Sequence, residues 1–171
     1  NLTGANLTNA IMDGVDLTGA TLTSAKLGGA NLTGNADLTN AILSKADLTG
    51  ADLTSALLNG ADLTGAKLKN ADLDLVNLSG ANLTSADLTG ATLTNIIISA
   101  TTNLTSAKLV SADLTGDTLS GVQMAKADLT GATLTDAIFS ATLDANGVET
   151  TAAANLTGAN LTNAIMDGVD L

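Results

Sequence analysis

The residues best suited to chemistry are Asp144, Asn146 and Glu149, which form a D-x-N-G-x-E run. Their carboxylate and amide oxygens are the type of ligand that a calcium ion binds. The run lacks the ligand number and spacing of an EF-hand loop. Asn146 is followed by Gly147, and this pair is the strongest two-residue signal for a β-hairpin. The segment therefore has two interpretations, a weak calcium site and a plain hairpin turn, of which we favour the hairpin.

The composition excludes most other chemistry. The 171 residues carry 6 Lys and 17 Asp+Glu, a formal charge of −11, and include no His, Cys or Arg. Without His and Cys there is no Ser-His-Asp or Cys-His nucleophile pair and no zinc or iron site of the usual ligand types. We therefore expect no enzyme and no cofactor. No apolar run approaches the roughly 20 residues of a membrane span.

Most of the chain follows a five-residue period. Large apolar residues recur at this interval, with one extra residue near Asn35 and another near Thr101. A small residue, usually Ala, precedes each large one by two positions, and the repeat reads A-(D/N)-L-(T/S)-x. A period of five fits neither an α-helix nor an ordinary strand. It indicates a chain that turns a corner every five residues, with Leu and Ala pointing inward and the polar residues facing water.

This pattern resembles the pentapeptide-repeat family over nearly the whole chain. The resemblance implies an all-β fold, a right-handed quadrilateral β-helix (solenoid) in which four pentapeptides form a coil. Grouping the apolar centres in fours gives about seven regular four-sided coils up to Phe139, followed by an irregular loop and the start of a further repeat. At a strand spacing of about 4.8 Å, these coils form a rod about 34 Å long.

The same grouping places charges of opposite sign above one another. On the second side of the rod, the residue before each centre alternates between Lys and Asp from coil to coil. Each exposed pair of such a ladder contributes a few tenths of a kcal/mol. The predicted charge ladder consists of Lys26, Asp47, Lys67, Asp87, Lys108 and Asp128. The predicted structural core includes Leu7, Leu17, Leu27, Leu48, Leu68, Leu88, Leu109, Leu129 and Phe139.

The chain divides into three parts. Residues 1–139 are expected to form the regular β-helix, and residues 140–154 an irregular loop or hairpin insertion that projects from a corner. Residues 155–171 are identical to residues 1–17, at an offset of 154 residues. This copy indicates a larger tandem repeat, of which the chain holds one unit and the start of the next. An engineered origin of the copy stays open, although the irregular slips argue against a consensus design.

A few positions depart from the repeat code. Outward Leu57, Ile97 and Ile138 alternate with polar residues on the fourth side. This stripe has two interpretations, a lateral contact surface and ordinary surface scatter. Asp117 and Thr102 occupy positions of the small inward residue. An unpaired buried carboxylate at Asp117 is costly.

These observations favour a non-catalytic structural protein. We expect a repeat unit of a long β-helical rod or fibre, such as a bacterial cell-surface or extracellular filament or adhesin. The expected partner is the protein itself, in a homo-oligomer or filament assembled end to end or laterally, with lateral protein partners also open. We expect no nucleic-acid partner.

The alternative comes from the resemblance. Some pentapeptide-repeat proteins resemble a DNA duplex in shape and charge and bind DNA gyrase in its place, which implies a cytoplasmic protein. The charge of −11 fits this alternative loosely. We expect the acids to be dispersed over the second, third and fourth sides, with the second side neutralised by its lysines, so that no face presents a continuous phosphate-like row.

Overall fold

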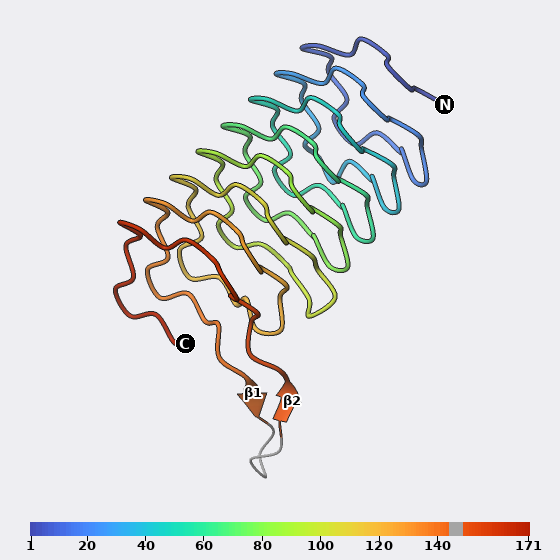
Figure 1. Cartoon of the computed structure of the whole chain (residues 1–171). Helices are drawn as coiled ribbons and strands as arrows, with labels where there is room; N and C mark the ends of the chain where they lie inside the picture. The colour runs from blue at the N-terminus through green and yellow to red at the C-terminus, as the bar shows by residue number, and fades with distance from the viewer. Residues whose placement is uncertain (144–148) are drawn as a thin grey trace.

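The chain forms a rod of stacked coils with a hairpin projecting near one end (Figure 1). The computed structural model describes residues 1–143 and 149–171, without the side chains of 142, 143, 149 and 150. The described residues contain no helix, and therefore none that is long and apolar enough to cross a membrane. Two named strands, β1 (Thr142–Leu143) and β2 (Glu149–Thr151), form the hairpin.

The rod is held together by four ladders of parallel backbone bridges, one for each side. Within the regular part, bridged residues are 20 or 21 positions apart, so one coil contains four pentapeptides. The ladder of the first side runs through Thr21, Ile42, Asp62, Asn82, Asn103, Gln123 and Asn155. The third runs through Ile11, Asn31, Asp52, Asp72, Thr92, Asp113, Thr133 and Ile165. The second and fourth sides carry the candidate surfaces described below.

A regular corner is a four-residue turn whose third residue has a positive φ. At the first corner, the Ala5 N–H donates to the Leu2 carbonyl at 2.9 Å, and Gly4 takes a φ of 66°. A positive φ at the third position is the requirement of a type II turn. The extra residue at Asn35 is absorbed here, because Gly34 and Asn35 both have positive φ while Ala36 N still bonds to Thr33 O at 3.0 Å.

The polar part of the code stabilises the same corners. The Oδ1 atom of Asp52 accepts hydrogen bonds from the Thr54 N–H at 3.0 Å and from the Thr54 hydroxyl at 2.7 Å. The same pairing of an outward Asp or Asn with the residue two positions on recurs at most sides, as at Asn31 and Thr33. This Asx turn explains why the repeat reads (D/N)-L-(T/S).

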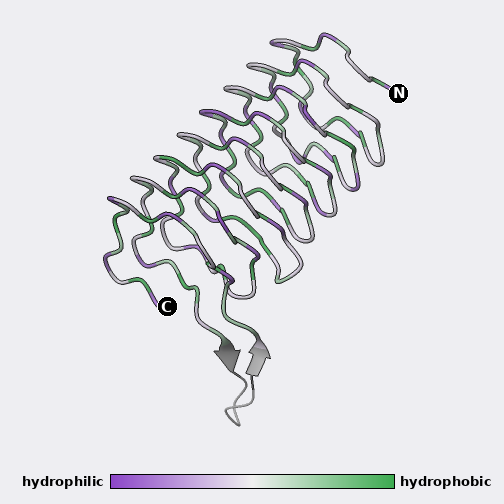
Figure 2. Ribbon diagram, in the orientation of Figure 1, coloured by the Kyte–Doolittle hydropathy of each residue, from purple (hydrophilic) through white to green (hydrophobic). Residues whose placement is uncertain are grey.

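Leu and Ala fill the interior of the rod. Figure 2 shows hydrophobic and hydrophilic residues alternating along the coils. Of the predicted core residues, the six from Leu27 to Leu129 are fully buried and Phe139 is almost so. Leu7 and Leu17, by contrast, are only partly buried. They belong to the first described coil, which is covered by a neighbouring coil on one face only.

The hairpin is inserted at a corner without disturbing it. β1 and β2 pair antiparallel, with Thr142 opposite Thr151. At the base of the insertion, the Ala154 N–H donates to the Phe139 carbonyl at 2.8 Å, which is the same closing bond that Ala5 and Leu2 form at a regular corner. The rod then continues, because Asn155 bridges to Gln123.

Leu75 is the least expected corner residue. It has a φ of 61° at a position where Gly, Asn or Ser usually stands, and half of its surface is exposed. The left-handed conformation costs a residue with a Cβ about 1–2 kcal/mol, and Asn tolerates it better than Leu does.

We predict that Leu75→Asn raises the free energy of unfolding by about 0.5–1 kcal/mol, because it relieves this conformational strain. Urea unfolding followed by circular dichroism measures the change. Leu75→Ala is the matched control, since it removes the exposed side chain but lacks the short polar group through which Asn tolerates a positive φ. Equal stabilisation by the two variants would contradict the explanation by strain.

Candidate interaction surfaces

The second side brings the predicted charge ladder together in one column. Parallel bridges join each member to the next, so Lys and Asp alternate from coil to coil. The column runs through Asn6, Lys26, Asp47, Lys67, Asp87, Lys108, Asp128 and Asn160. The side chains stand on adjacent strands about 4.8 Å apart, as a charge ladder requires.

Few of these neighbours form close ion pairs. The Lys67 Nζ lies 3.8 Å from Asp47 Oδ2, and both side chains are largely exposed. The second pair, Lys69 Nζ to Asp87 Oδ2 at 3.3 Å, involves a lysine that sequence reasoning missed because it follows a centre instead of preceding one. Exposed pairs of this kind contribute less than about 1 kcal/mol. The Thr49 hydroxyl, more than Lys67, lowers the pKa of Asp47.

The fourth side carries the predicted apolar stripe. Its ladder runs through Asp16, Asp37, Leu57, Asn77 and Ile97, and resumes through Thr118, Ile138 and Asp170. Ile97 is 55% exposed and Ile138 36%, whereas Leu57 is less exposed. Among the described residues, no bridge joins Ile97 to Thr118, so the ladder is interrupted there.

Thr102 repairs the corner beside this interruption. Regular corners send the N–H of their glycine to a carbonyl of the next coil, as Gly60 does to Ser79 at 2.9 Å. At Gly80 the extra residue near Thr101 displaces that carbonyl. The buried Thr102 Oγ1 accepts from the N–H groups of Gly80 at 3.1 Å and Ser99 at 3.2 Å, and donates to Leu78 O at 2.9 Å. The Ser99 hydroxyl also accepts the Gly80 N–H, at 3.0 Å.

Asp117 lies on the other side of the interruption and is only 2% exposed. Its Oδ1 accepts the Ile96 N–H at 3.1 Å, while its Oδ2 has no partner among the described residues. Burial raises the pKa of Asp117 to about 7, and the carboxylates of Asp113 and Asp74 act in the same direction. The carboxyl group is therefore held largely protonated below neutral pH.

The calcium candidate is not placed by the structure. Asp144 and Asn146 lie outside the described residues, and only the backbone of Glu149 is described, in β2. Within residues 1–143 and 149–171, no group of acidic side chains is arranged to hold a metal ion, and no pocket is found. The calcium site stays a prediction.

The ladders, inward Leu and Ala columns and turned corners define a β-helical repeat protein. The sequence model of the family "Pentapeptide repeats" matches in eight copies, over residues 1–34, 35–70, 56–95, 102–140 and 152–171. The chain belongs to the pentapeptide-repeat family, which confirms the resemblance noted from its sequence. The fold associated with this family is the right-handed quadrilateral β-helix.

Solved structures support this assignment. HetL, a pentapeptide repeat protein involved in heterocyst differentiation regulation in the cyanobacterium Nostoc sp. strain PCC 7120, is 34% identical with a TM-score of 0.77. That match covers 98% of this chain and 72% of HetL. A trypsin-treated form of QnrB1, a plasmid-mediated fluoroquinolone resistance protein, is 20% identical with a TM-score of 0.56, covering 97% of this chain and 88% of QnrB1. The likeness to QnrB1 is one of fold alone. No curated protein sequence matches the chain.

We predict that Thr102→Val lowers the free energy of unfolding by about 1–3 kcal/mol, because it keeps the shape of the side chain but leaves buried polar groups without their partner. Thr102→Ser is the matched control and should cost less than about 1 kcal/mol, since it keeps the hydroxyl. Urea unfolding measures both changes. Equal losses for Val and Ser would show that packing, and not the hydroxyl, matters at this corner.

We predict that stability falls between about pH 4 and pH 7. An unfolded Asp releases its proton near pH 3.9, whereas folded Asp117 keeps it to about pH 7, so the folded chain binds more protons in this window. The free energy of unfolding then decreases as pH rises, by an amount on the order of 4 kcal/mol, and levels off above pH 7.

Urea midpoints at pH 5 and pH 8 test this prediction, with Asp117→Asn as the variant that cannot titrate. The carboxylates with lowered pKa values, such as Asp16 and Asp37, lose their stabilising contribution only at more acidic pH. Their effect therefore falls outside the window. If Asp117→Asn keeps the wild-type slope, another group is responsible for it.

Proposed function

We propose that this chain is a non-catalytic structural protein, a repeat unit of a long β-helical rod or fibre at a bacterial cell surface or outside the cell. The unit comprises about seven regular coils, the hairpin insertion and the start of the next repeat. Units continue one another end to end, and rods associate laterally.

The observation that carries this proposal is the position of residues 155–171. Seven successive bridges lead from Asn6 to Asn160, its counterpart in the copied sequence, and both residues stand on the second side. Likewise, Ile11 and Ile165 share the third side, and Asp16 and Asp170 the fourth. The tandem offset therefore corresponds to a whole number of turns, so a following unit would begin in the same orientation.

The copied sequence forms backbone hydrogen bonds to the next coil at one end of the rod and to the preceding coil at the other end. In residues 1–17, Leu7 N donates to Lys26 O of the next coil at 2.7 Å. In residues 155–171, Asn160 N donates to Ala127 O of the preceding coil at 2.9 Å. The same sequence thus makes the contacts of a first coil in one place and of a continuing coil in the other, which supports an uninterrupted junction between units.

The second candidate is the DNA mimic that binds DNA gyrase. The observation that favours it is that the ladders of the third and fourth sides carry six aspartates and no lysine. The second-side ladder argues against it, because lysines interrupt the acids there at every other coil. A gyrase supercoiling assay tests this candidate, and inhibition at low protein concentration would support it over the structural role.

We predict that a protein with two tandem units forms one rod that is longer than the single unit by about 34 Å, since seven coils are added at the strand spacing. Electron microscopy and small-angle X-ray scattering measure the length. The control joins the second unit through a flexible Gly/Ser linker of about ten residues, which allows the two rods to bend relative to one another. Indistinguishable scattering from the two proteins would contradict a continuous junction.

A further inference from the structure

The positive charges of the rod are confined to one face. Three lysines belong to the second-side ladder, a fourth follows a centre on that side, and two lie at the corner that leads into it. This lysine face contains Lys26, Lys67, Lys108, Lys69, Lys45 and Lys126, which are all the basic residues of the chain. With three aspartates on the same ladder, Asp47, Asp87 and Asp128, it has an excess of positive charge.

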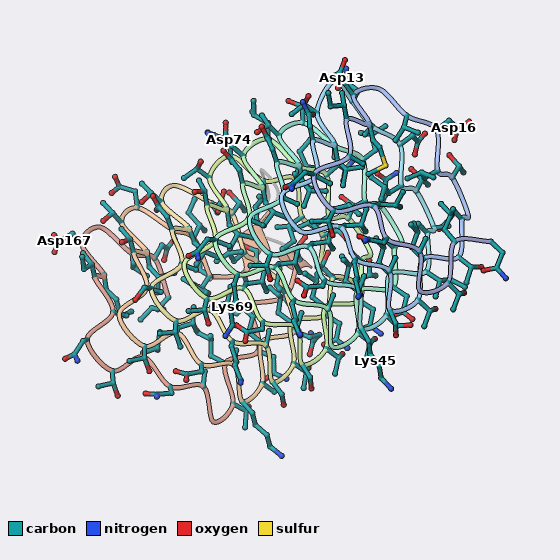
Figure 3. The ribbon with its side chains drawn as sticks, turned by 90° about the horizontal axis from the view of Figure 1, so that it is seen from above. Asp13, Asp16, Lys45, Lys69, Asp74 and Asp167 are labelled. Atoms are coloured by element: carbon teal, nitrogen blue, oxygen red, sulfur yellow. The ribbon has the colours of Figure 1, made fainter. Side chains whose placement is uncertain are left out.

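Most of the negative charges lie on other faces of the rod. The corner between the third and fourth sides forms an acidic edge, defined by Asp13, Asp74, Asp136 and Asp167. In Figure 3, Asp13, Asp74 and Asp167 follow one long edge of the rod, away from Lys45 and Lys69. The flanking ladders add Asp16, Asp37, Asp52, Asp72, Asp113 and Asp170. Most aspartates of the ladders lie on the second, third and fourth sides, as expected from the sequence, but the lysines are confined to the lysine face.

The acidic edge has no counter-charge among the described residues. Neither of the two ion pairs among the described residues involves it, since both lie on the lysine face. Asp74 is held instead by the Thr94 hydroxyl at 2.7 Å and the Asn95 amide at 2.9 Å, which lower its pKa and keep it ionised. On the adjoining ladders, Asp52 is bridged directly to Asp72, a juxtaposition of like charges that is unfavourable in an isolated rod.

A second, independent feature lies on this edge. Leu75, directly after Asp74, adopts the strained left-handed conformation while half exposed. Two residues further on, Asn77 bridges to Ile97, which is also more than half exposed. Backbone strain and exposed apolar side chains are both typical of surfaces that bind a partner. The edge therefore combines carboxylates with aliphatic side chains.

We propose that the acidic edge of one rod docks laterally against the lysine face of a second copy. Lysine fits this edge chemically, because its aliphatic stem can cover Leu75 and Ile97 while its ammonium group reaches the aspartates. Lys26, Lys67 and Lys108 recur every second coil, as do Leu57, Ile97 and Ile138, so both rows have a spacing of about 9.6 Å.

The geometry of this contact decides the kind of assembly. The two faces differ, so the contact is heterologous, and each rod keeps a free face for a further partner. Rods that associate in this way form open bundles and not closed dimers. This proposal rests on the structural role proposed above and names the lateral partner in it.

Two full-length variants test the proposal. The first neutralises lysines that have no ion pair among the described residues, by Lys26→Gln, Lys45→Gln, Lys108→Gln and Lys126→Gln. The second neutralises the acidic edge by Asp13→Asn, Asp74→Asn and Asp136→Asn, in which the amide keeps the Oδ1 acceptor used by Thr33 and Thr94. Circular dichroism and urea unfolding verify that both variants fold.

Sedimentation analysis in about 20 mM salt should show large assemblies of the wild-type chain that dissociate in about 500 mM salt, where charges are screened beyond a few ångströms. Each variant alone should associate at least about tenfold more weakly. An equimolar mixture should restore association, but only as pairs, because each variant retains one competent face. No complex in the mixture would overturn the heterologous contact.

A matched control changes charge by the same amount on the opposite face. Asp47→Asn, Asp87→Asn and Asp128→Asn remove three negative charges from the lysine face, so this variant should associate more strongly than wild type. If it weakens association as much as the acidic-edge variant does, net charge and not the pairing of faces is responsible.

Electron microscopy distinguishes a failure of lateral docking from a failure of the proposed structural role. Filaments of tandem units that stay single in low salt would overturn lateral docking and leave the rod intact. A failure of tandem units to form filaments would overturn the structural role. A wild-type chain that binds polylysine but not itself would assign the acidic edge to a different basic partner and overturn self-association.

Discussion

The structure depends on one constraint, that every coil must present its backbone groups in register with the coil before and after it. Each side satisfies this constraint through a pair of bonds, such as Leu27 N to Asp47 O at 2.6 Å and Asp47 N to Ala25 O at 2.9 Å. A chain that gained or lost one residue on a side would turn its Leu outward and its polar residue inward. The five-residue period keeps successive coils in register, and extra residues are accommodated in the corners.

The irregular positions follow from the same constraint. At Asn35 the extra residue is accommodated in the turn itself. Near Thr101 it displaces a carbonyl, and the hydroxyls of Thr102 and Ser99 accept the Gly80 N–H in its place. Beyond it, the fourth-side ladder loses a bridge, and Asp117 takes the N–H of Ile96. A buried threonine and a buried aspartate thus mark the place where the backbone alone does not satisfy its own hydrogen bonds.

Much of the architecture could be predicted from the sequence, because the period of Leu and Ala fixes which residues point inward and which share a column. The alignment of Lys26 with Asp47 and Lys67 depends on that period alone. The Lys69–Asp87 pair could not be predicted in this way, since it depends on how far a side chain reaches across coils. The strain at Leu75 was equally hidden, because the repeat code leaves the corner residue unspecified. The confinement of the lysines to one face becomes evident only when Lys45 and Lys126, which lie at corners, are also assigned to a side.

The bond between Ala154 and Phe139 has a consequence for how such a rod can vary. Because the corner closes around the insertion as it does around two residues elsewhere, the length of the inserted segment is uncoupled from the register of the coils. A segment at this corner can therefore lengthen, shorten or change its sequence without altering the stack that carries it. The rod is then a regular support on which the inserted segment at one corner can vary in length and sequence.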